Sequence, residues 1–313
     1  MPLTALVRSA LAAAALASIC VTQGLAQTPT QAPAKGPDGL RPPTLNAQPE
    51  ARIPGKFIWF DLVTPEPYAS KAFYGIVFNW DFHSIGSGAG RYTLIENKGR
   101  NIGGMHFRPS AKGDKGPRDG SRWLALMSVS DPAAAAKYVE AHGGKVLVAP
   151  TRFEGRGTHA LFRDDEGAVF GVLTSDSGDP PEGAPISGEF LWLDLFSRDP
   201  QKSAEFYRGL ASYDVTTKQT SPQTVRIGLA TAGVTRASIL TMPKEVTQAG
   251  WLPFVQMDDV AAAVKRAADN GGKVLLAPRP EYYGGHIAVI ADPFGGVIGI
   301  VNRTEAAKKG PAK

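Results

Sequence analysis

Two segments far apart in the chain each place a tryptophan two residues before an aspartate. The segment FIWFDL contains Trp59 and Asp61, and the segment FLWLDL contains Trp192 and Asp194. Alternate side chains of a β-strand share a face, so each indole would lie beside its carboxylate. Such a pair predicts a platform that binds a ligand, and a desolvated aspartate with a raised pKa could act as a base. These four residues are candidate ligand-binding residues, and the two aspartates are also candidate catalytic residues.

A structural alternative explains the same pairs without chemistry. Backbone or arginine contacts would satisfy the two aspartates, and the tryptophans would fill space between strands. The residue pattern by itself favours this alternative. It also leaves the identity of any catalytic residue unknown.

The histidines add one further candidate. His106, in the segment GGMHF, is a candidate catalytic residue and the single candidate metal donor. His159 in GTHALF and His286 in GGHIAV occupy similar settings, but aligning the alanine that follows offsets them by one residue. They would then face opposite sides of their strands, so we interpret each as a strand-end or surface residue. His83 and His142 are typical of surface positions.

Four other residues could line the mouth of a pocket and attract an anionic ligand, although loop residues of this kind are often simply solvated. They are Arg156, Arg226, Tyr282 and Tyr283. The chain has no Ser-His-Asp order, phosphate-binding loop, dinucleotide fingerprint or HExxH segment, which are the short motifs of several common enzyme classes.

The elements that would position these residues occur twice. Residues 57–74 return as 190–207, residues 143–150 return as 271–278, and residues 164–173 return as 292–301. The first pair is offset by 133 positions and the other two by 128. The chain therefore consists of two homologous halves that differ by a five-residue deletion inside the repeat.

Each half reads as two consecutive βαβββ modules. In each module a strand precedes a helix, and three short strands separated by turn signals follow it. Asp131-Pro132 and Asp199-Pro200 predict helix starts, and Asp258 is the expected cap of the fourth helix. The fold class is therefore α+β, with four modules in one chain.

Several of these blocks carry a family resemblance. They are WFDLVTPEPYASKAFY, WLDLFSRDPQKSAEFY, the two GGKVL turns, and the endings DDEGAVFGV and DPFGGVIGI. With them, residues 55–303 resemble the vicinal oxygen chelate superfamily, which includes glyoxalase I, extradiol dioxygenases and antibiotic-binding resistance proteins. The resemblance implies two glyoxalase-like domains, each with paired modules that form a cup lined by the concave face of a sheet.

The resemblance also implies where metal-dependent members place their ligands. In this chain those positions hold tryptophan, leucine and glycine, whose side chains do not bind a divalent ion, and His106 alone does not make a site. We therefore expect no metal triad and no cofactor. The implied ligand positions fall on Trp59 and Gly171 and at or next to Leu124 in the first half, and on Trp192 and Gly299 and at or next to Leu252 in the second.

The N-terminus predicts export. A basic residue, Arg8, precedes an apolar, alanine-rich run and the small residues Gly24 and Ala26, which is typical of a cleaved signal peptide. An uncleaved anchor is the alternative, and a lipoprotein at Cys20 is disfavoured by Ile19 before it. The predicted divisions are a signal peptide (1–26), a disordered Pro-rich tether (27–52), the first domain (53–175), a linker (176–188), the second domain (189–303) and a disordered basic tail (304–313).

The leading interpretation is an exported, periplasmic or secreted protein that binds a small aromatic or amphipathic molecule in one or both cups. The alternative is a metal-dependent lyase or isomerase, or an extradiol-type dioxygenase; a structural or interaction role is a third. The net charge is +5, with basic and acidic residues interspersed, so we expect no nucleic-acid partner. We also expect no membrane span after signal cleavage. Four modules can complete two cups internally, so a monomer is expected.

Overall fold

The first strand of each half sorts its side chains onto two faces. In β1 (Phe57–Thr64), Phe60 and Leu62 enter an apolar core that also contains Phe73 of the following helix. Trp59 lies on the opposite side, in a separate cluster with Leu126. The predicted alternation is therefore confirmed, and it defines the inner face of each sheet as the face turned away from the helices.

The computed structural model describes residues 52–86, 92–109 and 120–303, with the exception of 245 and 247. The expected signal peptide (1–26), the expected tether up to residue 51 and the expected tail (304–313) lie outside the described residues. In the part that is described, no helix has the length and apolarity needed to cross a membrane.

The first half contains two modules that each follow the predicted βαβββ order. The elements after β1 are α2 (Pro67–Phe78), β2 (Asp81–Ile85), β3 (Tyr92–Asn97), β4 (Arg100–Phe107), β5 (Arg122–Ser128), α3 (Pro132–Ala141), β6 (Lys145–Phe153), β7 (Gly157–Arg163) and β8 (Val169–Ser175). The predicted cap is confirmed, because the Asp131 side chain accepts hydrogen bonds from two backbone N–H groups at the start of α3.

The second half repeats this order. Its elements are β9 (Phe190–Ser197), α4 (Pro200–Ala211), β10 (Asp214–Ser221), β11 (Thr224–Thr231), β12 (Val234–Thr241), β13 (Gly250–Gln256), α5 (Val260–Asp269), β14 (Lys273–Leu276), the short 3-10 helix η3 (Tyr283–Gly285), β15 (Ile287–Ala291) and β16 (Val297–Val301). Asp199 caps α4 as predicted. The cap of α5 was predicted one residue early: Asp259, not Asp258, accepts from Ala262 N.

Each half forms one eight-stranded mixed sheet. The strand orders are β2-β3-β4-β1-β5-β8-β7-β6 and β10-β11-β12-β9-β13-β16-β15-β14. In each sheet the two modules join through their antiparallel first strands, β1 with β5 and β9 with β13. The predicted α+β class and the four modules are confirmed, with two tandem domains of one architecture.

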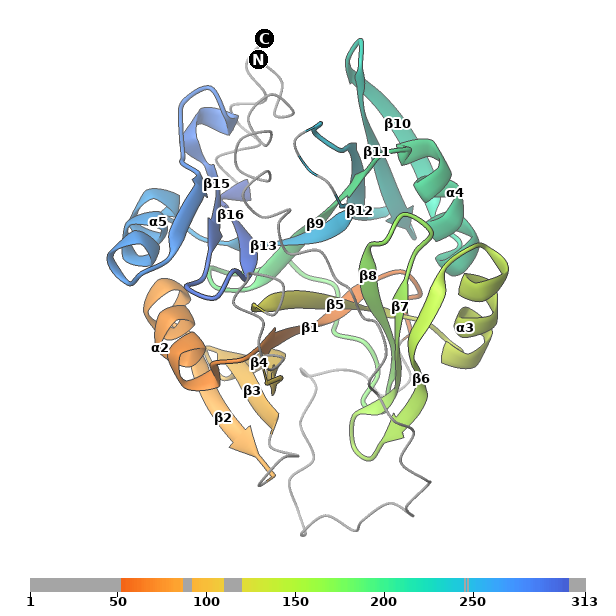
Figure 1. The fold of residues 1–313 in the computed structure, drawn as a ribbon, viewed down its shortest axis with the longest axis horizontal. Coiled ribbons are helices and arrows are strands. Elements are labelled where there is room, and N and C mark those ends of the chain that lie inside the picture. Colours follow the sequence, from red (N-terminus) through yellow and green to blue (C-terminus); the bar gives the residue numbers. More distant parts are fainter. Residues whose placement is uncertain (1–51, 87–91, 110–119, 245, 247, 304–313) are drawn as a thin grey trace.

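Each helix packs on the sheet of its own half, and the helices also pair across the two halves (Figure 1). Helix α2 lies beside α5, and α3 lies beside α4. One apolar core combines Val77 of α2 with Ala267 of α5, and another combines Val139 of α3 with Phe206 of α4. Each core therefore needs a module from both halves.

A repeated polar chain crosses each of these cores. The Tyr74 hydroxyl on α2 donates to Asp292 Oδ2 in the other half at 3.0 Å, and Trp123 Nε1 donates to the same hydroxyl at 3.0 Å. In the second copy, Tyr207 on α4 donates to Asp164 Oδ2 at 2.9 Å. Since a buried carboxylate requires such partners, these tyrosines join the halves by polar as well as apolar contacts.

The burial of Asp164 predicts that stability depends on pH. Burial raises the pKa of Asp164 to about 6 from 3.8, although hydrogen bonds from Tyr207 and from backbone groups act in the opposite direction. Between these two pH values the folded chain holds a proton that the unfolded chain has lost. The free energy of unfolding should therefore fall as pH rises from about 4 to about 6, by on the order of 2 to 3 kcal/mol.

Urea unfolding across this pH range measures the effect. Asp164→Asn, which cannot titrate, should remove that component of the pH profile while preserving side-chain shape. If the substituted chain has the same pH profile as the unsubstituted chain, Asp164 does not hold the proton.

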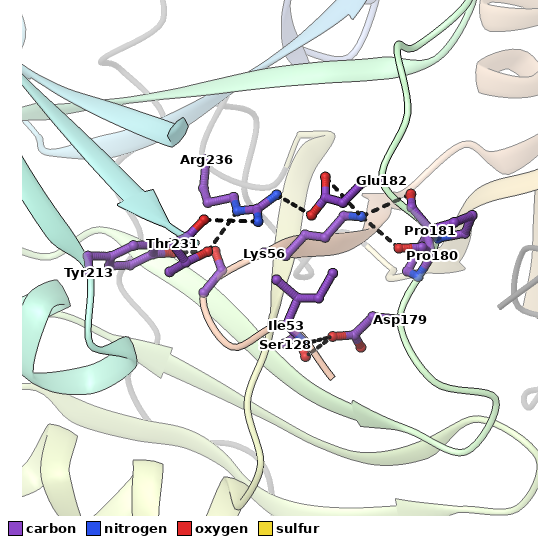
Figure 2. Close-up of polar contacts among 11 residues, drawn as sticks. Ile53, Lys56, Ser128, Asp179, Pro180, Pro181, Glu182, Tyr213, Thr231 and Arg236 are labelled. Atoms are coloured by element: carbon purple, nitrogen blue, oxygen red, sulfur yellow. Dashed lines mark hydrogen bonds and ion pairs between the residues drawn. The ribbon is translucent and has the colours of Figure 1, made fainter. Parts of the chain in front are cut away.

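The segment between β8 and β9 carries no helix or strand and is attached to both halves (Figure 2). Asp179 Oδ2 accepts a hydrogen bond of 2.6 Å from Ser128 Oγ on β5. Glu182 Oε1 lies 2.7 Å from Arg236 Nη1 on β12. Two residues of the connection, three positions apart, therefore anchor it to the first sheet and to the second.

Candidate functional site

Asp61 is the centre of a polar group on the inner face of the first sheet. Its buried carboxylate accepts hydrogen bonds from Trp59 Nε1 at 3.0 Å and from Tyr92 Oη at 2.6 Å. Arg156 Nη2 lies 2.6 Å from the second carboxylate oxygen. We call these four residues the first-half polar group. The arginine contact that the structural alternative anticipated is present.

A glycine on the neighbouring strand makes room for this arrangement. Gly104 on β4 pairs directly with Asp61 on β1. A Cβ atom at Gly104 would lie 1.6 Å from Tyr92 Oη. The tyrosine, which comes from β3, therefore reaches the carboxylate through space that any other residue at this position would fill.

Arg156 reaches the same carboxylate from the turn between β6 and β7. Its guanidinium carbon lies 5.7 Å from the ring centre of Trp59 and 5.3 Å from that of Tyr92, within cation–π range. Only 11% of the Arg156 side chain is exposed. The two modules of the first half therefore contribute one residue each to this cation–carboxylate pair.

This pair decides the charge of the site. Burial alone would raise the pKa of Asp61, but the charge of Arg156 and hydrogen bonds from His106 and Tyr92 outweigh it and hold the pKa below its usual value. Burial and the charge of Asp61 raise the pKa of Tyr92, so the phenol stays protonated and donates. An aspartate held by these donors is poorly suited to accept a proton.

His106 joins the first-half polar group from the solvent side. Its Nε2 lies 3.5 Å from Asp61 Oδ2, and its ring centre lies 4.6 Å from that of Tyr92. Its side chain is 44% exposed. The structure therefore brings two of the three candidate catalytic residues together, and His106 is the accessible one.

The second half holds a related but simpler arrangement. Asp194 Oδ1 accepts from Trp192 Nε1 at 2.8 Å and from Arg226 Nη2 at 2.9 Å. Arg226 Nε donates to Ser238 Oγ at 3.0 Å. Trp192 is partly exposed, and the guanidinium carbons of Arg226 and Arg303 lie 5.9 Å and 6.0 Å from its ring centre.

The strand registers show which positions correspond. Tyr92 pairs with His106 on β4, and Arg226 pairs with Leu240 on β12. Ser238 pairs with Asp194 as Gly104 pairs with Asp61. The same site on the third strand of the module thus supplies a tyrosine to one aspartate and an arginine to the other.

The pKa values of the two aspartates are consequently shifted in opposite directions. Burial raises the pKa of Asp194, and the charge of Arg226 with the Trp192 hydrogen bond offsets this only in part. Asp194 lacks a counterpart of His106, because Leu240 occupies that position. The repeated Trp-Asp motif therefore provides a fully ion-paired carboxylate in the first half and a more weakly stabilised one in the second.

An apolar cluster borders Trp192 on the inner face of the second sheet. Tyr282 belongs to this cluster and is buried, so its predicted place at a pocket mouth is wrong, whereas Tyr283 is partly exposed. The buried members are Phe196, Leu240, Val246, Leu252, Phe254, Leu276, Tyr282, Ile287 and Val289.

The remaining histidines divide into two groups. His83 is exposed beside Glu96, and His142 is exposed at the end of α3, as predicted. His286 caps η3 ahead of β15. His159 differs from its prediction as a strand-end or surface residue, because it lies within β7 and pairs with Leu173 of the inner cluster. Burial and the charge of Arg156 lower its pKa to about 4.

The residues at the implied metal positions do not fit a divalent ion. Leu124 pairs with Asp61, and Gly171 pairs with Leu126, so both positions are on the inner face. A Cβ atom at Gly171 would lie 2.7 Å from Leu126 Cγ, which leaves no space for a longer acidic side chain.

The second half shows the same packing. A Cβ atom at Gly299 would lie 2.1 Å from the ring of Phe254. In the described part of the chain, no three His, Cys, Asp or Glu side chains lie close enough together to hold a metal ion. The carboxylates nearest the implied positions are instead paired with arginines, and an arginine cannot be a ligand.

Tyr92 is the residue of the candidate site that sequence reasoning missed. Its strand was predicted, but nothing in the sequence places its hydroxyl beside Asp61. The signal that could have found it was the glycine pair at 103 and 104 in a strand, since an internal strand glycine often marks close approach of another group.

Comparisons with known proteins agree with this architecture. The model of the Glyoxalase/Bleomycin resistance protein/Dioxygenase superfamily matches residues 56–172 and 189–300. The chain is 29% identical over 265 residues to the anthracycline biosynthesis protein DauV of Streptomyces sp. strain C5, across 81% of this chain and 95% of that protein. It is 28% identical over 264 residues to the anthracycline biosynthesis protein DnrV of Streptomyces peucetius, across 80% and 94%.

Solved structures show the same fold at lower identity. The Mn(II)-bound glyoxalase from Novosphingobium aromaticivorans matches with a TM-score of 0.55 and 18% identity, across 80% of this chain and 82% of that one. The 2,3-dioxygenase LapB from Pseudomonas sp. KL28 matches with a TM-score of 0.52 and 12% identity, across 80% and 92%. At these identities the likeness supports the fold alone.

Proposed function

Because the chain belongs to the glyoxalase/bleomycin resistance protein/dioxygenase superfamily, we propose that it is an exported protein that binds a small aromatic or amphipathic molecule on its inner faces without the usual metal triad. Export rests on the signal-like residues 1–26. The binding proposal rests on the polar groups around Asp61 and Asp194.

One observation carries the binding proposal: each inner face holds an indole, an aspartate and an arginine in contact. On the second face the partly exposed Trp192 offers its ring directly, with two guanidinium groups near it. On the first face Trp59 is buried, and it supports Arg156 and the partly exposed Tyr92 from beneath. Aromatic rings with a few fixed polar groups are typical of small-molecule sites.

The relatives support an aromatic or amphipathic ligand class. Two proteins that match most of this chain are named for anthracycline biosynthesis. An anthracycline is therefore a reasonable probe, together with simple phenols and aliphatic molecules of similar size.

Tryptophan fluorescence tests the proposal. A ligand that stacks on Trp192 should quench the emission of the full chain, and Trp192→Ala should weaken binding by about tenfold or more, since an aromatic contact contributes roughly 0.5 to 1.5 kcal/mol beyond its buried area. Trp80→Phe is the matched control, because Trp80 lies in the core shared with α2. If no member of the panel quenches the unsubstituted chain, the binding function has no support.

A second candidate is a lyase or isomerase, or a ring-cleaving dioxygenase, of the same superfamily. The observation in its favour is His106, an exposed histidine against the buried Asp61. In this candidate His106 would move a proton at Nε2, while Arg156 and Tyr92 would hold the substrate. The donor set described above does not fit the metal that such members use, so the binding function is preferred.

A further inference from the structure

Several side-chain nitrogen atoms among the described residues of the first half are buried without a hydrogen-bond partner, and two of them lie near Asp61 on the first inner face. These two are Arg156 Nε and His159 Nδ1, and neither side chain is fully exposed. Leaving a buried polar atom unsatisfied costs about 1 to 3 kcal/mol, so each such atom in a folded protein calls for an explanation. Because both atoms lie on the same face, one explanation can account for both.

Arg156 cannot turn away to satisfy its free nitrogen. Its Nη2 is held by Asp61 at 2.6 Å, and its plane lies near the rings of Trp59 and Tyr92. The Nε–H group can only donate, because a guanidinium has no acceptor atom. The described residues offer this N–H no acceptor, which leaves that position to an oxygen of a bound ligand.

His159 is held in an equally definite position. Its ring stacks on Phe153 with centres 4.4 Å apart and planes 7° from parallel. Its pKa of about 4 makes the imidazole neutral near neutral pH. Among the charged groups that act on it, Arg156 has a stronger effect than Asp61, with His106 acting in the same direction as Arg156. A negatively charged oxygen is therefore favoured beside it.

We infer that Arg156 Nε and His159 form a subsite for the carboxylate of an aromatic ligand on the first inner face. The carboxylate would accept from the arginine Nε–H and from the imidazole in its Nδ1–H tautomer. The exposed ring of Phe153 and the partly exposed ring of Tyr92 would contact the apolar part of the ligand. This inference rests on the proposed binding function and names a ligand class for one of the two faces.

The second half serves as an internal comparison. Leu161 pairs with Gly171 and Val289 pairs with Gly299, so the residue that corresponds to His159 is Ile287. Ile287 is buried and apolar. The carboxylate subsite is therefore specific to the first half, and the two faces would prefer different ligands.

Benzoate and its neutral analogue benzamide test the subsite by calorimetric titration of the full chain. Benzoate should bind more tightly than benzamide. Arg156→Lys keeps the charge beside Asp61 but removes the Nε–H, and His159→Phe keeps the ring on Phe153 but removes Nδ1. Each should weaken benzoate binding by about tenfold, the scale of one charge-assisted hydrogen bond. His286→Gln, in the second half, should have no effect.

A second readout does not depend on these variants. Benzoate should raise the pKa of the His159 imidazole above about 4. The proton resonances of that ring, recorded in NMR titrations over pH, measure the change. Benzoate affinity that is equal to benzamide affinity, or that is unchanged in both variants, would overturn the subsite even if the panel quenches Trp192. If neither benzoate nor any panel member binds, the proposed binding function fails as well.

Discussion

Arg156→Met is expected to lower the free energy of unfolding by about 3 to 5 kcal/mol near neutral pH, the usual cost of removing one partner of a buried ion pair. Methionine keeps much of the side-chain length but leaves Asp61 buried and charged without its cation. The hydrogen bonds from Trp59 and Tyr92 remain, and they compensate only part of that charge. Urea unfolding of both chains measures the difference.

The pH profile separates this electrostatic cause from a simple packing defect. In the unsubstituted chain the pKa of Asp61 is lowered, so its contribution is complete above pH 3.8 and is lost as pH falls. Without Arg156, burial should raise that pKa, and the variant should gain stability relative to the parent as pH falls. Adding Asp61→Asn to Arg156→Met should recover much of the loss. A cost below about 1 kcal/mol with no pH dependence would contradict the assignment.

Tyr74→Phe and Tyr207→Phe should each cost about 1 to 3 kcal/mol, because each leaves a buried carboxylate and a buried indole N–H without a shared partner. The partners are Asp292 with Trp123, and Asp164 with Trp251. The two sets of hydrogen-bonded residues have no residue in common, so the double variant should lose free energy of unfolding by about the sum of the two single costs.

Tyr138→Phe is the matched control for these substitutions. The Tyr138 hydroxyl donates to a backbone carbonyl at 3.1 Å in a partly buried place, and no carboxylate depends on it. Its removal should cost less than removal of either hydroxyl that donates to an aspartate. Equal costs for all three would mean that the tyrosine–aspartate contacts add no more stability than an ordinary hydrogen bond to a backbone carbonyl.

The repeat explains why the fold could be predicted from the sequence. Each half supplied the same order of apolar periods and turn residues, so an error in one copy could be checked against the other. The limits appear where one residue matters. Two adjacent aspartates, Asp258 and Asp259, can both begin a helix, and the choice depends on packing that a sequence pattern does not contain.

The candidate site was less predictable, because its contacts join distant residues. Asp61 and Arg156 are 95 positions apart, and Asp61 and Tyr92 are 31 apart. Strand alternation placed Trp59 beside Asp61 but could not select which arginine would reach it. His159 was misassigned because aligning the following alanines showed only that His159 and His286 face opposite sides of their strands. The alignment did not show that the His159 side chain lies on the inner face.

The repeated tyrosines show that a sequence motif can predict a helix without predicting which residues its polar groups contact. Tyr74 and Tyr207 end the two repeated blocks, in which the spacing of the apolar residues predicts a helix. Their hydroxyl groups in fact reach the opposite half. Sequence periodicity locates an apolar face, but it does not name the domain that covers it.

Metal content is the most direct test of the central claim, which is that arginine-paired aspartates replace the metal triad. Elemental analysis of the full, untagged chain, purified without chelator and supplied with Mn, Fe, Ni and Zn during growth, should find well below one ion per chain. One ion per chain that is lost in Asp61→Asn or His106→Gln would contradict the claim, because it would show these donors holding a metal.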